Sequence, residues 1–278
     1  GRSEAPPYFR AIPIDRKTDS AVNTSAAIRE KTVLLLKKSL DNHEWRQRRC
    51  VNLIPSEMTQ SSLVRLLQIT DPCGRYAEHK ELLAAFEQEV FYYQGTEFIA
   101  WAEDRLVEEM QCFLGFPLVE TRLISGQMAN MTVFSALVDF LNRTDRRREP
   151  RRIPLVMNNH IGKGGHLSSQ PMGALRDYVA KDPVTEKYSI LNFPVLEDNP
   201  YRIDLKETAN LLDRFDPGLI ILGKSMILHP EPVAAIRKML DTKSNRPVIM
   251  YDMAHVLGLI GPYFQNPFAE GADIITGS

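Results

Sequence analysis

Residues 247–258 read PVIMYDMAHVLG, and this segment gives the clearest indication of the fold. A proline opens it, and a short run of apolar and aromatic residues leads to Asp252. Such a run, bounded by a proline and a polar turn, is typical of a fully buried strand in a parallel sheet that is covered on both faces. Ligands of open α/β sheets bind beyond the carboxyl ends of the strands. We therefore expect Asp252 at the edge of the sheet where a ligand would bind.

Asp252 taken alone has two interpretations. An aspartate that follows a strand is most often a turn residue or a helix cap. At the rim of a site, the same carboxylate can pair with a buried cation and keep it protonated. The ring nitrogen of a pyridoxal cofactor is a natural partner of this kind. The remainder of the chain has to decide between the two.

The second half of the chain alternates strand-like runs with helical patterns. The further strand-like runs are RLISG (122–126), IPLVMNN (153–159), YSILNFPV (188–195), GLIILG (218–223) and ADIITGS (272–278). Asp204 and Pro232 stand where helices are expected to begin, because aspartate caps helices and proline tolerates the first turn. This alternation predicts an α/β fold, a three-layer sandwich around a mostly parallel sheet.

The chain divides into three expected parts. Residues 1–24 are polar and rich in proline, which predicts an extended arm. Residues 25–115 are predicted to be mainly helical, with an amphipathic helix over 25–40 and a further helical period over 82–93. Residues 116–278 hold the strand–helix alternation and are expected to form the ligand-binding domain.

Composition excludes several classes of partner. The formal net charge is -1, so no overall field recruits nucleic acid or an acidic membrane surface. No apolar run approaches the length of a membrane span, and the sequence begins without a recognisable signal peptide. Cys50, Cys73 and Cys112 lack metal-ligand spacing and fit a reducing compartment. We expect a cytoplasmic protein without a metal, a nucleic-acid partner or a membrane partner.

GLIILGKS (218–225) matches the phosphate-loop pattern of nucleotide triphosphatases, which makes such an enzyme a rival interpretation. A phosphate loop turns its backbone N–H groups around phosphate and then opens a helix. Here the apolar residues 219–222 favour a strand, and their side chains require burial. The pattern therefore puts a strand where the loop would have to be, and we reject the match.

Three further groups fall at expected strand ends. SGQMAN (125–130) turns into a helix, where Gly126 permits a tight turn and the N–H groups of Gln127 and Met128 could bind an anion. His166 follows two glycines and could stack on a planar ligand, although a capping or surface role fits it equally well. Ser225 follows a strand, as Asp252 does. Together these groups favour a planar, anionic cofactor.

Eight peptides along the chain resemble the serine hydroxymethyltransferase family and occur in that family's order. They are LIPSE (53–57), RYAE (75–78), YYQGTEFI (92–99), SGQMAN (125–130), GGHL (164–167), GKS (223–225), DMAH (252–255) and DIITGS (273–278). The resemblance implies a fold type I pyridoxal-phosphate enzyme of one-carbon metabolism that acts as a homodimer or a dimer of dimers. It implies an amino-acid substrate, with tetrahydrofolate as the partner in converting serine to glycine.

The resemblance also implies roles for individual residues. Asp252 would hold the ring nitrogen protonated, His166 would stack on the ring, and Ser225 and His255 would lie near its phenolic oxygen. The remaining implied cofactor contacts are Gly126, Gln127, Ser278 and, from the partner subunit, Tyr76. The implied catalytic residues are Glu78, Tyr93 and His255; Ser56, Glu78 and Tyr93 would contact the substrate. The implied folate contacts are Ile161, Gly165 and Leu167.

Two alternatives remain open at this point. The peptide between Glu78 and Tyr92 departs from the family pattern, which would suit a folate-independent threonine-type aldolase or transaldolase. The family's Schiff-base lysine would fall just beyond Ser278 and its small C-terminal domain would follow, so we also consider a non-catalytic relative without the lysine. A Thr-His-Lys sequence after Ser278 would favour an enzyme. A requirement for tetrahydrofolate would favour the hydroxymethyltransferase.

Overall fold

The computed structural model describes residues 25–77, 79–81, 89–144 and 151–278. The chain forms two compact units, Gly1–Leu53 and Ile54–Ser278. The predicted arm, residues 1–24, lies outside the described residues. Within the described ranges, no helix is both long enough and apolar enough to cross a bilayer.

The first unit consists of one long helix in its described part. Helix α1 (Ser25–Glu44) begins where the sequence predicts but continues to Glu44, and a π-helical turn, Trp45–Arg49, follows it. None of its side chains is buried, although several are large and apolar, including Leu35 and Leu36. The large apolar side chains of α1 are therefore exposed within the first unit.

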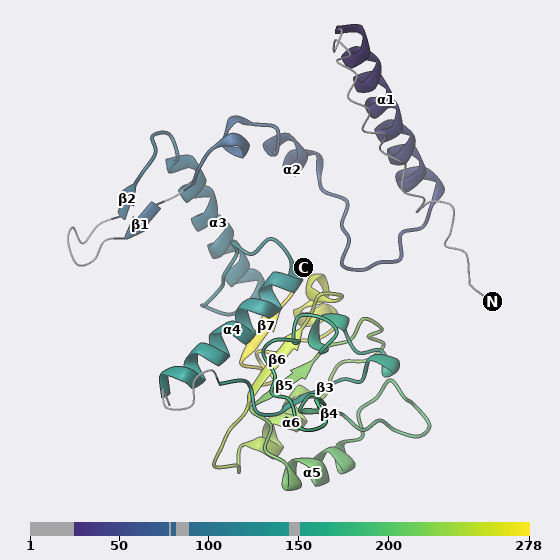
Figure 1. Cartoon of the computed structure of the whole chain (residues 1–278), viewed down its shortest axis with the longest axis vertical. Coiled ribbons are helices and arrows are strands. Elements are labelled where there is room, and N and C mark those ends of the chain that lie inside the picture. Colours follow the sequence, from purple (N-terminus) through teal and green to yellow (C-terminus); the bar gives the residue numbers. More distant parts are fainter. Residues whose placement is uncertain (1–24, 78, 82–88, 145–150) are drawn as a thin grey trace. The chain divides into compact units, whose positions relative to one another are not determined.

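The centre of the second unit is a five-stranded sheet with the order β4-β3-β5-β6-β7, and every pair of neighbours is parallel (Figure 1). The strands are β3 (Val156–Asn158), β4 (Ile190–Asn192), β5 (Leu219–Leu222), β6 (Val248–Asp252) and β7 (Ile274–Thr276). The helices associated with the sheet are α4 (Gly126–Thr144), α5 (Leu205–Arg214) and α6 (Val233–Leu240). The predicted α/β class with a parallel sheet is thus confirmed.

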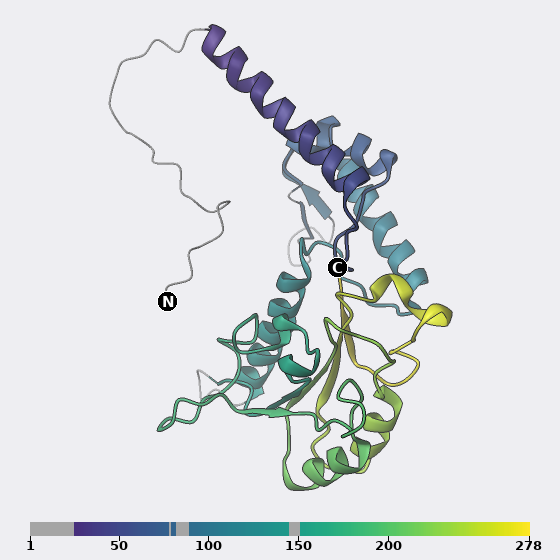
Figure 2. The same ribbon diagram turned by 90° about the vertical axis from the view of Figure 1, so that its right-hand side faces the viewer.

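Side chains alternate between two hydrophobic layers, one on each face of the sheet. Figure 2, coloured as Figure 1, shows the ribbon of α4 on one side of the sheet and those of α5 and α6 on the other. Ile220 and Leu222 of β5 pack with residues of α5 and α6, whereas Leu219 and Ile221 pack with Phe134 of α4 and with the segment 174–179. All four β5 side chains are fully buried. Burial on both faces explains why the strand reads as a continuous apolar run. It also confirms that residues 219–222 are a strand and not a phosphate loop.

Further helices and a strand pair precede the sheet in the second unit. They are α2 (Ser62–Leu67), the antiparallel hairpin of β1 (His79–Glu81) and β2 (Glu89–Phe91), and α3 (Glu97–Leu114). Helix α3 ends at Gly115, which has a left-handed backbone conformation with φ of 64°. Directly after it, the ring of Phe116 stacks on Phe268 with centroids 4.0 Å apart. This contact joins the end of α3 to the sheet domain.

Two predicted elements are corrected by the structure. The helical period over 82–93 is wrong at Glu89–Phe91, which forms β2; residues 82–88 lie outside the described residues. The strand predicted at 122–126 does not form. There the backbone N–H of Arg122 donates to the Glu120 carboxylate at 2.9 Å rather than to a neighbouring strand. Local hydrogen bonds of this kind compete with a sheet ladder.

Candidate active site

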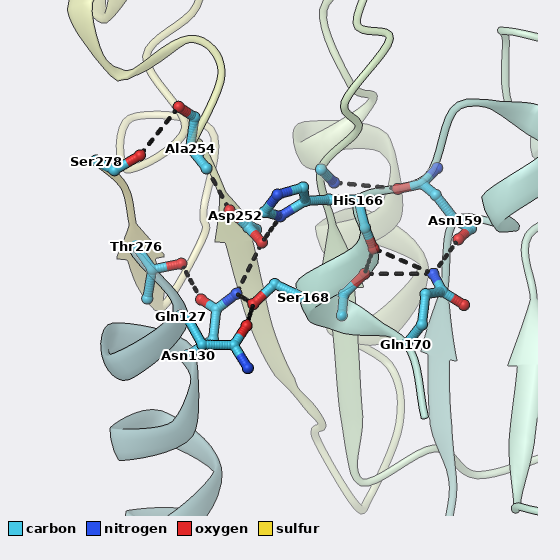
Figure 3. A network of polar contacts seen from close by, with 12 residues as sticks. Gln127, Asn130, Asn159, His166, Ser168, Gln170, Asp252, Ala254, Thr276 and Ser278 are labelled. Carbon is cyan, nitrogen blue, oxygen red and sulfur yellow. Dashed lines mark hydrogen bonds and ion pairs between the residues drawn. The ribbon is translucent and has the colours of Figure 1, made fainter. Parts of the chain in front are cut away.

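Asp252 is the last residue of β6, at the carboxyl end of the sheet, and its side chain is buried. One carboxylate oxygen, Oδ2, accepts a hydrogen bond from Nδ2 of Asn130 at 2.8 Å and lies 2.5 Å from Nδ1 of His166 (Figure 3). The other oxygen, Oδ1, accepts from the backbone N–H of Ala254 at 3.1 Å. The structure therefore brings Asp252 and His166 into direct contact. The sequence predicted only that both residues lie at the same edge of the sheet.

Asn130 lies one turn inside α4 and is buried. Its amide nitrogen donates to Oγ of Ser168 at 2.8 Å as well as to Asp252, and its amide oxygen accepts from Oγ1 of Thr276 at 2.6 Å (Figure 3). Sequence reasoning did not single out Asn130, Ser168 or Thr276. The available signal was a polar residue inside the SGQMAN motif, at a helix position that faces the sheet.

The loop that carries His166 is shaped by a close backbone approach. Gly165 is buried, and a Cβ atom built on it would lie 2.2 Å from the carbonyl oxygen of Asn159, so only glycine fits. Gly165 also forms an isolated antiparallel bridge with Lys224, and the N–H of His166 donates to the carbonyl of Gly223 at 3.3 Å. These contacts hold the imidazole beside the end of β6.

The N-terminus of α4 offers open donors next to this group. Ser125 caps the helix, because its Oγ accepts from the N–H of Met128 at 3.1 Å. The predicted open donor on Met128 is therefore already used, and the open N–H groups of the first turn are those of Gly126 and Gln127. The Gln127 side chain accepts from Ser168 through Oε1 at 3.0 Å, and Figure 3 shows its amide nitrogen pointing away from Asp252.

Two further residues that were predicted to contact the cofactor, His255 and Ser278, lie near Asp252. The rings of His255 and His166 meet edge to face with centroids 5.1 Å apart. Nδ1 of His255 is buried, and the described residues offer it no hydrogen-bond partner. Burial lowers the pKa of His255, the neighbouring His166 lowers it further, and Asp252 opposes both. Oγ of Ser278 donates to the carbonyl of Ala254 at 3.3 Å.

Other predicted site residues stand apart from this group. The rings of Tyr76 and Tyr93 are 5.0 Å apart and both are exposed. We call Asp252 and the residues around it, Asn130, His166, Ser168, His255 and Thr276, the Asp252 group. Within the described residues, no hydrogen bond or ring contact joins either tyrosine, or Ser56, to this group. Glu78 lies outside the described residues.

The remaining predicted residues lie near His166 in sequence or at a strand end. The predicted folate residues Ile161 and Leu167 are exposed and flank His166 along the chain, with the buried Gly165 between them. Ser225 is exposed after β5.

Comparison with known proteins assigns a family to this arrangement. The sequence profile of the family described as "Serine hydroxymethyltransferase" matches residues 32–278. The serine hydroxymethyltransferase of Pyrobaculum calidifontis is 34% identical over 240 residues, which cover 86% of this chain and 49% of the relative. That of Pyrobaculum aerophilum is 33% identical over 245 residues, 88% of this chain and 50% of the relative. That of Staphylothermus marinus is 32% identical over 239 residues, 85% of this chain and 48% of the relative.

The chain thus spans about half the length of the curated relatives it matches. The profile match extends through both the helical segment and the α/β sheet, and it includes every residue of the Asp252 group. The chain therefore belongs to the serine hydroxymethyltransferase family.

Proposed function

We propose that this protein provides the cofactor-binding part of a pyridoxal-phosphate-dependent serine hydroxymethyltransferase, which converts serine and tetrahydrofolate to glycine and methylenetetrahydrofolate. One observation carries the proposal: the buried carboxylate of Asp252 is held at the end of β6 by neutral amide and peptide donors and by one imidazole. The family names of the relatives favour this activity over a folate-independent aldolase and over a non-catalytic relative.

The residues present fit pyridoxal phosphate. Asp252 accepts three hydrogen bonds in a carboxylate that has about four acceptor positions, so Oδ1 keeps one for a protonated ring nitrogen. The open N–H groups of Gly126 and Gln127 at the start of α4 suit a phosphate, because a helix N-terminus favours anions. When bound, the cofactor supplies an electron sink for negative charge at the substrate Cα.

The chain's own groups would do three things around that sink. Asp252 would keep a proton on the ring nitrogen, since a nearby carboxylate favours the cationic form. His166 would cover one face of the ring while its Nδ1 remains on Asp252. His255, whose pKa is lowered by burial, would present a neutral imidazole, with Ser225 and Ser278 as neighbouring hydroxyl groups.

The remaining assignments are extensions of the same proposal. Ser56 would contact the substrate carboxylate, with Glu78 and Tyr93 at its hydroxyl, and the segment around His166 would receive the folate through Ile161, Gly165 and Leu167. Residues 116–278 would bind the cofactor, and residues 25–115 would form the subunit interface of a homodimer. The exposed apolar side chains of α1 support an interface there, because a second copy could bury them.

The test is serine cleavage by the protein as encoded, with and without tetrahydrofolate. Glycine formation that requires both tetrahydrofolate and added pyridoxal phosphate is the expected result. Cleavage of threonine or serine that is indifferent to tetrahydrofolate would instead identify an aldolase. Tight binding of pyridoxal phosphate with neither activity would identify a non-catalytic relative.

A further inference from the structure

We propose that Asn130 is a positioning residue, which fixes the Asp252 carboxylate in the orientation that pairs with the cofactor ring nitrogen. The inference rests on the proposed function, because it concerns how the same site is built. Neither the chain's motifs nor the family's name assigns a role to this side chain. It follows from the hydrogen bonds of one buried amide.

The Asn130 amide can adopt only one orientation. Thr276 donates to its oxygen at 2.6 Å, and its nitrogen faces the oxygens of Asp252 and Ser168, both at 2.8 Å. A flipped amide would turn its oxygen toward the carboxylate and lose two hydrogen bonds at once. Both N–H bonds and the carbonyl are therefore committed, in a side chain that is 1% exposed.

The amide in turn limits what the carboxylate can do. Asn130 and His166 both approach Oδ2, and the Ala254 N–H takes one position on Oδ1. The acceptor position that remains is on Oδ1, on the oxygen that Asn130 does not touch. Without the amide, Asp252 could rotate and offer Oδ2 instead, because a carboxylate torsion is soft. Asn130 thus selects which oxygen meets the ring nitrogen.

The same amide ties three elements to the site. It projects from α4, whose first turn carries the open donors of Gly126 and Gln127, and it contacts β7 through Thr276 and the loop after His166 through Ser168. The carboxylate and the proposed phosphate donors are therefore linked through one helical turn. A cofactor that spans both ends would depend on this link for its fit.

Asn158 offers a matched control. It is also a buried asparagine, on β3 of the same sheet, but its amide nitrogen donates to the carbonyl of Ser169 at 2.7 Å and its oxygen accepts from Asn192 at 2.7 Å. Neither partner is a carboxylate. A change at Asn158 therefore reports what the loss of a buried asparagine does to folding alone.

The experiment measures pyridoxal-phosphate affinity by fluorescence quenching for Asn130→Ala, Asn130→Asp and Asn158→Asp, each relative to the unchanged protein. Asn130→Ala is expected to bind about tenfold or more weakly, the effect of losing one hydrogen bond to a charged group. Asn130→Asp puts a second carboxyl group beside Asp252, and two such groups at this distance share one proton. The protonated form can donate to Asp252 in place of the amide.

The affinity of Asn130→Asp, as a ratio to that of the unchanged protein, is therefore expected to recover as pH falls from about 8 to about 5. For Asn158→Asp the same affinity ratio, measured on the folded protein, is expected to show no such recovery, because residue 158 contacts Ser169 and Asn192 and not Asp252. This control separates positioning from folding. Unchanged affinity in Asn130→Ala, or recovery in Asn158→Asp alone, would overturn the positioning role while leaving the proposed function intact. An unchanged protein that binds no pyridoxal phosphate would overturn the proposed function and this role with it.

Discussion

Among the described residues of the second unit, Asp252 at the end of β6 and Glu231 just before α6 have buried carboxylates, and the surroundings of the two differ. Glu231 pairs with the ammonium group of Lys224 at 2.6 Å, with both side chains at most 2% exposed. Asp252 is held by an amide, a peptide N–H and an imidazole. Among the described residues no lysine or arginine contacts it.

The difference distinguishes a structural carboxylate from one that can bind a cation. The charge of Glu231 is already matched inside the protein, and Lys224 is also held by the carbonyl of Tyr201 at 2.8 Å. Burial nevertheless raises the pKa of Glu231, and the contact with Lys224 only partly opposes this. A perturbed pKa alone would have pointed to Glu231 as the functional group. The partners, rather than the shift, identify Asp252.

Breaking the buried ion pair between Lys224 and Glu231 is expected to have the largest effect on stability. Glu231→Gln leaves the Lys224 ammonium buried without a counter-charge, which should cost about 3–5 kcal/mol of unfolding free energy. Urea denaturation measures it. The double change Lys224→Met with Glu231→Leu should cost less than the single one, because apolar replacement removes both charges together. If Glu231→Gln left the unfolding free energy almost unchanged, the ion pair between Lys224 and Glu231 would not be formed in solution.

Removing the carboxylate of Asp252 is expected to weaken cofactor binding more than it destabilises the fold. Asp252→Asn keeps the shape but cannot stabilise a protonated ring nitrogen, so pyridoxal-phosphate affinity should fall about a hundredfold, or about 2.7 kcal/mol. The unfolding free energy should change by only about 1–2 kcal/mol, since the neighbours of Asp252 are mostly uncharged donors. Calorimetric titration and denaturation of the same variant measure both quantities. A larger loss of stability than of binding would reverse the comparison.

The sheet was predictable because the local sequence of its central strands already indicates a buried strand. Residues 219–222 and the run that ends at Asp252 are continuous apolar stretches, and burial on two faces demands that pattern. The start of α5 was equally local, since Asp204 accepts from the N–H groups of Lys206 and Glu207. By contrast, β2 at Glu89–Phe91 depends on pairing with β1, and the run 122–126 lacks a strand partner. Both errors concern hydrogen-bond partners that a helical or strand period does not reveal.

The site was predictable in its chain positions but not in its contacts. Strand ends and glycine turns indicated Asp252 and His166, because parallel strands collect their ends at one edge. The bond between the two, and the amide of Asn130 that supports it, join residues 86 and 122 positions apart. Lys224 lies in the rejected phosphate-loop pattern, and that pattern gave no indication of its ion pair with Glu231. Such pairings come from packing of the whole domain.

Gly165 joins the two carboxylate groups, because it bridges to Lys224 and directly precedes His166. In Gly165→Ala the new methyl group would meet the Asn159 carbonyl, whose oxygen lies 2.2 Å from the ideal Cβ position. The expected cost is about 2 kcal/mol of unfolding free energy, typical of overpacking, together with weaker cofactor binding. Gly258→Ala is the matched control, since nothing lies within 4 Å of its Cβ position. If Gly165→Ala lowered the unfolding free energy but left cofactor binding unchanged, the Lys224–Glu231 pair and the Asp252 site would be independent of each other.

The smallest expected effect is a pH dependence at His255, which faces the open carboxylate group through His166. The pKa of His255 is lowered by burial and by His166, while Asp252 opposes both. As pH falls below about 6.5, the unfolded chain takes up a proton that the folded chain resists, so stability declines toward the lowered pKa. Above that window the group contributes nothing. His255→Gln should therefore flatten the acid side of the stability curve, measured by urea denaturation at several pH values. If the slope were unchanged, His255 would titrate alike in both states and would not share the buried surroundings of Asp252.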